Sequence, residues 1–160
     1  MTPCPHQIGR IMAVMEAAFD PAFGEAWNER QVTDALTMPT TRALIIDAAG
    51  LELKGVPSDD SSEVPAGFVL TRQAADEEEL LLVAVLPEHR RNGLARKLIE
   101  RLLTCARERG VTRIFLEMRR GNPAIHLYEK VGFEPIGQRS NYYRMANGSR
   151  ADAITFGLTV

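Results

Sequence analysis

The chain is poor in cysteine and lacks any long apolar run. Its two cysteines, Cys4 and Cys105, stand about a hundred residues apart, which excludes a disulfide framework and a thiolate metal site of ordinary spacing. No apolar stretch approaches the roughly twenty residues that a membrane helix needs, and residues 1–6 lack the apolar core of a signal peptide. We therefore expect a cytoplasmic protein that holds no metal and does not enter a membrane.

The sequence also lacks an excess of basic residues. Nineteen Lys and Arg stand against twenty-one Asp and Glu, giving a formal net charge of -2. A general nucleic-acid-binding protein normally carries a basic excess, so we expect no nucleic-acid partner. At 160 residues, 45% apolar and 25% charged, the composition predicts one globular domain over residues 1–160. Within it, residues 47–66 are rich in Gly, Pro, Ser and Asp, as is typical of a flexible loop or long hairpin.

Apolar periodicity predicts alternating helices and strands. Helices are expected at 8–19, 28–36, 93–109 and 124–131, with Asn28 as an N-cap. Strands are expected at 42–46, 67–71, 79–86, 113–118, 135–143 and 153–158, and the third of these is apolar enough to lie at the centre of the sheet. Helices that alternate with strands and end in a hairpin predict an α/β fold with one mixed sheet.

The most informative segment is the turn Arg90-Arg-Asn-Gly-Leu-Ala95, which follows an apolar strand and opens an amphipathic helix. Such a turn directs backbone N–H groups and the positive end of a helix toward one point, which suits a phosphate group. Gly93 lets the backbone approach a ligand closely, Ala95 keeps the next position small, and Arg91 and Arg96 add positive charge. The alternative is an ordinary strand-to-helix turn with solvated arginines.

A second segment, Phe115 to Phe133, places Glu117 on a strand, Asn122-Pro123 at a break, and Tyr128 on a helix. With both segments in order, the chain resembles the GNAT family of acetyl-CoA-dependent N-acetyltransferases. The turn at 90–95 resembles that family's pyrophosphate motif, and Leu127-Tyr-Glu-Lys-Val-Gly-Phe133 resembles its Leu-Tyr-Glu-Lys-x-Gly-Phe signature. Leu116-Glu-Met-Arg119 and Arg139-Ser-Asn-Tyr-Tyr143 are further similar to the RimI-type enzymes, which acetylate the α-amine of a ribosomal protein.

The resemblance implies a GNAT fold, with a mostly antiparallel sheet splayed at the coenzyme, and direct attack of an amine on the thioester of acetyl-CoA. It implies Glu117 as general base and Tyr128 as general acid, with a backbone N–H near Val85 polarising the acetyl carbonyl. The coenzyme contacts it implies are Val83, Ala84, Val85, Arg90, Arg91, Asn92, Gly93, Leu94, Ala95, Arg96 and Asn122. Alternatively, Tyr128 is a buried packing residue, and Glu117 forms a salt bridge with Arg119 or Arg139.

The acceptor implied by the resemblance is the N-terminus of a protein, in a groove walled by residues 19–28 and 138–153. Tyr142 and Tyr143 alternate on a strand, so at most one of them faces that groove. The acidic residues Glu77 to Glu79 are interpreted as a solvated strand end. The alternative is an acidic patch that attracts a cationic N-terminus toward the site. The sequence does not indicate an oligomeric state or a partner protein.

One departure from the family pattern concerns Asn122, which stands six residues before Tyr128 instead of seven. The loop has lost a residue, which puts its coenzyme contact in question. Two other functions stay open. The shortened loop leaves open a non-catalytic acyl-CoA sensor, and the long loop at 47–65, if it closes the site, favours a GNAT enzyme that acetylates a small amine, such as an aminoglycoside, a polyamine or an amino acid.

Overall fold

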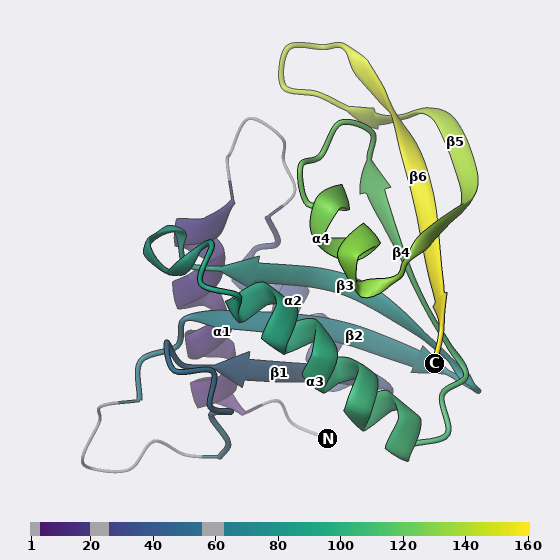
Figure 1. Ribbon diagram of the computed structural model, residues 1–160. Helices are drawn as coiled ribbons and strands as arrows, with labels where there is room; N and C mark the ends of the chain where they lie inside the picture. Colours follow the sequence, from purple (N-terminus) through teal and green to yellow (C-terminus); the bar gives the residue numbers. More distant parts are fainter. Residues whose placement is uncertain (1–3, 20–25, 56–62) are drawn as a thin grey trace.

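The computed structural model of the chain describes residues 4–19, 26–55 and 63–160. In these ranges six strands form one mixed sheet in the order β1-β2-β3-β4-β6-β5 (Figure 1). The strands are β1 (Thr41–Ile46), β2 (Gly67–Ala74), β3 (Glu77–Val85), β4 (Arg113–Arg119), β5 (Glu134–Arg144) and β6 (Arg150–Thr159). The helices are α1 (Pro5–Ala18), α2 (Glu29–Thr37), α3 (Leu94–Glu108) and α4 (Ile125–Val131), with the short 3₁₀ helix η2 (Pro87–His89) before α3.

Local sequence accounts for the helix starts. Asn28 accepts the backbone N–H of Gln31 at 2.8 Å, while the Gln31 side chain accepts the backbone N–H of Asn28 at 2.8 Å. This reciprocal capping box confirms the predicted N-cap. Pro5 begins α1, where its missing N–H costs no helical hydrogen bond. The predicted sheet, mixed and mostly antiparallel, is confirmed as well, because β3 and β4 are its one parallel pair within the described residues.

The sheet carries a separate apolar core on each face. On one face, α3 and α4 pack on residues such as Ile46, Val69, Ile114 and Phe156. On the other face, α1 and α2 pack on Ile45, Phe68, Leu70 and Leu82. Helices on both faces bury the central strands, which explains the nearly continuous apolar run of β3. Among the described residues, no helix is long and apolar enough to cross a membrane.

The sheet opens between β3 and β4. These strands pair at three positions, where Glu77, Glu78 and Glu79 lie beside Arg113, Ile114 and Phe115. Beyond these pairs the strands diverge, and Figure 1 shows β4, β6 and β5 rising away from β1–β3. The predicted splay of the sheet is therefore present, and the two diverging strands leave a cleft between them.

Two predictions need correction or restriction. Both interpretations of the acidic segment are wrong for Glu78, which is neither solvated nor available to attract an N-terminus. Its side chain is 0% exposed, accepts a hydrogen bond from the Thr71 hydroxyl at 2.6 Å and forms an ion pair with Arg109. The β1–β2 connection does span 47–66, but its start is an ordered turn in which Asp47 accepts the N–H groups of Ala49 and Leu51. Residues 56–62 of the predicted loop lie outside the described residues.

Candidate active site

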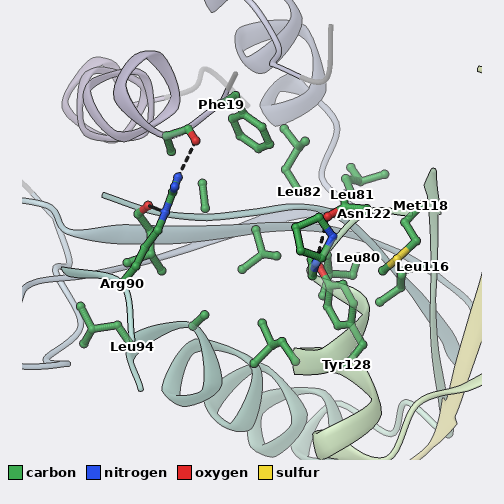
Figure 2. A pocket seen from close by; sticks show the side chains of 18 of the residues that line it. Phe19, Leu80, Leu81, Leu82, Arg90, Leu94, Leu116, Met118, Asn122 and Tyr128 are labelled. Atoms are coloured by element: carbon green, nitrogen blue, oxygen red, sulfur yellow. Dashed lines mark hydrogen bonds between the residues drawn. The ribbon is translucent and has the colours of Figure 1, made fainter. Parts of the chain in front are cut away.

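A cavity of about 1040 Å³ lies in the opening between β3 and β4. Its walls come from both strands, from the start of α3, from α4 and from Phe19 (Figure 2), and Trp27 also lines it. The strand residues that line it are Leu80, Leu81, Leu82, Val83, Ala84 and Val85 on β3, and Leu116, Glu117, Met118 and Arg119 on β4. The cavity thus joins the two segments that the sequence singled out.

A β-bulge in β3 marks the start of this cleft. Thr71 lies opposite Leu80 and Leu70 lies opposite Leu82, so Leu81 is an extra residue without a partner on β2. As a result Leu80 packs in the α3 core, whereas Leu82 packs in the α1 core. Sequence reasoning missed the bulge because a run of three leucines shows no alternation that an inserted residue could interrupt.

Beyond the bulge, β3 presents backbone groups to the open edge. The Leu86 N–H donates to the Ala66 carbonyl at 2.8 Å, which directs the backbone groups of every second residue toward β2. Because strand residues alternate, the N–H groups of Val83 and Val85 point the other way, where β4 has diverged. This arrangement agrees with the expected N–H donor near Val85.

The turn before α3 is held by two residues in the left-handed region, Arg91 at φ 66° and Gly93 at φ 77°. The first intrahelical bond of α3 runs from the Lys97 N–H to the Gly93 carbonyl at 3.0 Å, so the N–H groups of Leu94, Ala95 and Arg96 have no partner within the helix. All of these residues except Lys97 line the cavity. A Cβ at Gly93 would meet no atom within 4 Å, so its φ, rather than packing, favours glycine.

These donors fit the predicted coenzyme. The first turn of α3 supplies N–H groups and the positive helix end for a diphosphate, with Arg91 and Arg96 at the same end of the cavity. The edge of β3 supplies further N–H donors for the amide and carbonyl oxygens of an acyl-pantetheine arm. Among the described residues, no three His, Cys, Asp or Glu side chains gather to hold a metal ion.

Two residues of the turn lie differently from the others. Arg90 lines the cavity, yet its Nε donates to the Val85 carbonyl at 3.3 Å and its Nη2 donates to the Ala18 carbonyl (Figure 2). It therefore ties the ends of β3 and α1 together. Asn92 is exposed and is absent from the residues that line the cavity.

Glu117 and Tyr128 reach the cleft from different elements. Glu117, on β4, has a side chain that is 19% exposed, and its Oε2 lies 3.1 Å from Arg139 Nη2. Tyr128, on α4, is 4% exposed, and its ring meets the edge of Phe133 at 5.6 Å. The salt bridge with Arg139 and the packing of Tyr128, both offered as alternatives by the sequence, thus coexist with positions in the cleft wall.

The loop before α4 is ordered by Asn122. Its side-chain oxygen accepts the backbone N–H of Ala124 at 2.9 Å, and α4 begins at the next residue. Asn122 also lines the cavity, as does Tyr128, and both are labelled in Figure 2. In the shortened loop, the Asn122 oxygen is thus engaged in a turn that starts the helix carrying Tyr128.

Further aromatic side chains line the cleft from separate parts of the chain. Phe19, Trp27 and Tyr143 line the cavity. Tyr142 does not; it is 49% exposed and packs edge-on against Tyr143 at 5.2 Å. Tyr143 of the pair thus lines the cleft and Tyr142 does not, but the expected alternation is not kept, because the two rings pack against each other where β5 is irregular. Of the predicted wall at 19–28, residues 20–25 lie outside the described residues.

The fold and the cleft are those of an acyltransferase, and similarity to known proteins identifies the family. Residues 12–133 match the acetyltransferase (GNAT) family model, so the chain belongs to the GNAT family. It is 42% identical over 96 residues to the ribosomal protein bS18-alanine N-acetyltransferase of Escherichia coli strain K12, which covers 59% of this chain and 64% of that protein. The corresponding enzyme of Haemophilus ducreyi is 31% identical over 122 residues, 76% of this chain and 83% of that protein.

Solved structures agree with this assignment. The crystal structure of the ribosomal-protein-S18-alanine N-acetyltransferase from Escherichia coli superposes with a TM-score of 0.79 at 28% identity, covering 100% of this chain and 92% of that one. Ard1 from Thermoplasma volcanium, at 21% identity and a TM-score of 0.73, shares the fold. The chain spans about 60–64% of the length of the first curated relatives that it matches.

Proposed function

We propose that this protein transfers the acetyl group of acetyl-CoA to the N-terminal α-amine of a protein, and that the acceptor is a ribosomal protein of the bS18 kind in the cytoplasm. Its relatives from Escherichia coli and Haemophilus ducreyi carry that activity in their names. The observation that carries the proposal is structural: Glu117 and Tyr128 line one cleft, opposite the open edge of β3.

We assign the coenzyme site to the part of the cleft lined by β3 and the start of α3. Acetyl-CoA supplies an acetyl thioester, the reactive group of the transfer. The N–H groups at the start of α3, together with Arg91 and Arg96, bind its diphosphate, and the N–H groups of Val83 and Val85 hold the arm and polarise the acetyl carbonyl. Arg90 shapes this site by joining β3 to α1 rather than through its own charge.

Two proton transfers remain for the side chains of the cleft. Glu117 accepts a proton from the acceptor amine, directly or through a water molecule, so that the amine attacks as the neutral form. The phenol of Tyr128 donates a proton to the departing thiolate, whose pKa near 8.5 makes it a ready acceptor, and the proton that the attacking nitrogen loses as the amide forms restores the phenol. Because attack is direct, the chain needs no nucleophile of its own.

An α-amine suits this machinery. With a pKa near 8, an N-terminal amine is about one tenth neutral at pH 7, whereas a lysine near 10.4 is neutral about once in a few thousand molecules. The free energy needed to supply the neutral amine is thus small for an α-amine and much larger for a lysine. The smaller demand suits a single half-buried carboxylate as the base. Phe19, Trp27 and Tyr143 provide an apolar wall against which the first side chain of the acceptor packs.

The test is to follow free thiol release from acetyl-CoA with peptides that carry different N-termini, including that of bS18, beside spermidine, kanamycin and free amino acids. We expect turnover with peptides, and none when their α-amine is blocked. Glu117→Gln and Tyr128→Phe should each lower kcat by about 100-fold or more. Glu79→Gln, a half-exposed carboxylate at the other end of β3, is the matched control and should keep wild-type activity. Turnover confined to small amines would overturn the proposal.

A further inference from the structure

The carboxylate of Glu117 has a partner on a strand that is not its neighbour. Glu117 lies opposite Thr155 of β6, and Arg139 of β5 lies opposite Ala153 of the same strand. The Arg139 side chain therefore reaches across β6 to place Nη2 at 3.1 Å from Glu117 Oε2. Figure 1 shows β6 between β4 and β5 along this part of the sheet.

The Arg139 guanidinium is itself held in place. It lies over the ring of Tyr142 at 4.7 Å from the ring centroid, a cation–π contact. Tyr142 in turn meets Tyr143 edge-on, with an interplanar angle of 85°, and Tyr143 lines the cleft. Arginine suits this place because its planar group can stack on a ring and still donate to a carboxylate.

An irregular stretch of β5 brings these groups together. Arg139 pairs with Ala153 and Tyr143 with Ala151, so four steps along β5 match two along β6. Asn141, at φ 54°, turns the chain, and its N–H donates to Asp152 Oδ1 at 3.0 Å.

The other oxygen of this carboxylate, Asp152 Oδ2, accepts hydrogen bonds from Gln138 Nε2 at 2.9 Å and from Arg120 Nε at 3.3 Å. Asp152 thus fixes the shape that folds Tyr142 back beneath Arg139.

Stability does not explain the pair. The Arg139 side chain is 61% exposed, and ion pairs that open to water contribute little to folding. The position of the pair is more informative. Arg139 engages one carboxylate oxygen of Glu117, the residue proposed to face the acceptor. Other charged and titratable groups that line the cavity from β4, α4 and β5 are Arg119, Tyr128, Lys130 and Tyr143.

We propose that Arg139 is a positioning residue for the transfer: it binds Glu117 Oε2 and so holds Oε1 ready for the acceptor amine or its water. This inference rests on the proposed role of Glu117 as base. Without Arg139, the carboxylate rotates among several orientations, and few of them place an oxygen where the acceptor proton lies.

The experiment is a double-mutant cycle on kcat with the acceptor that the wild type acetylates. Arg139→Ala should lower kcat by about tenfold or more and leave the KM for acetyl-CoA unchanged, because the coenzyme residues lie on β3 and α3. In a Glu117→Gln background, Arg139→Ala should cost less than about twofold. Added guanidinium should restore part of the activity of Arg139→Ala, and Arg107→Ala, an exposed arginine near the end of α3 that does not line the cavity, is the control.

Equal losses in both backgrounds, or a loss confined to the KM for acetyl-CoA, would overturn the positioning role and leave the proposed function intact. A wild type that acetylates only small amines would overturn the proposed function, while the same cycle on that amine still decides the role of Arg139. A readout without turnover is the ¹H–¹⁵N signal of Arg139 Nε, which should move in Glu117→Gln. An unmoved signal would count against the contact.

Discussion

Glu78 and Arg109 form an ion pair at the end of β3 that still pairs with β4. The Arg109 guanidinium donates to Glu78 Oε2, while the Thr71 hydroxyl donates to Oε1 at 2.6 Å. Arg109 follows the last residue of α3, so the pair fastens that end of the helix to β2 and β3. The opposite end of α3 begins the proposed diphosphate site, where neither residue of the pair lines the cavity.

Removing the buried carboxylate should destabilise the protein without touching the chemistry. Glu78→Ala removes the carboxylate that accepts from Arg109 and Thr71. We expect a loss of about 3 kcal/mol in the free energy of unfolding, the lower end for broken buried pairs, because Arg109 is partly solvated and keeps its hydrogen bond to Gln73. Glu79→Ala, on the adjacent residue with a half-exposed pair to Arg72, should stay within about 0.5 kcal/mol. Urea unfolding measures both, and equal stability of the two variants would contradict the prediction.

Glycine is required at residue 93 for its conformation. Gly93→Ala places a Cβ on a left-handed residue, at a cost of about 1 kcal/mol, although no atom lies within 4 Å to clash with it. If the turn relaxes to relieve this strain, its N–H groups lose their common direction. We therefore expect acetyl-CoA to bind at least several-fold more weakly, as calorimetric titration would show.

The matched control for that prediction is Gly9→Ala. Gly9 also has no atom within 4 Å of its Cβ position, but it lies inside α1 with an ordinary φ. Alanine there should raise stability by about 0.5–1 kcal/mol and leave coenzyme binding unchanged. Unchanged binding in Gly93→Ala would show that the turn does not need its left-handed residue.

The turn in β5 should respond to acid through Asp152. The hydrogen bond from the Asn141 backbone N–H, aided by Arg120 and Gln138, lowers the pKa of Asp152 below its ordinary value of 3.8. A carboxyl group with a lowered folded-state pKa adds stability above its unfolded pKa, and this stability is lost as the pH falls through the folded value. Asp152→Asn should therefore lower Tm at pH 6 to 7, and the difference should vanish well below pH 3.8. A constant difference across that range would contradict the assignment.

Local sequence patterns predicted most of the elements. The strand-turn-helix at 83–98, the N-cap Asn28 and the terminal hairpin all appear where expected, because capping, apolar periodicity and turn chemistry act over a few residues. Boundaries moved where a side chain intervened: α4 begins at Ile125 because Asn122 binds the N–H of Ala124. Glu78 was misjudged because its partner Arg109 lies thirty-one residues away.

The sequence by itself determined the family, the two motifs and the residue types that the proposed chemistry needs, since each is written within a short segment. The tertiary structure decided where they meet. The opening between β3 and β4, the extra residue Leu81 and the reach of Arg139 to Glu117 depend on the register between strands that are distant in the sequence. Register is settled by packing across the whole sheet, which no local pattern records.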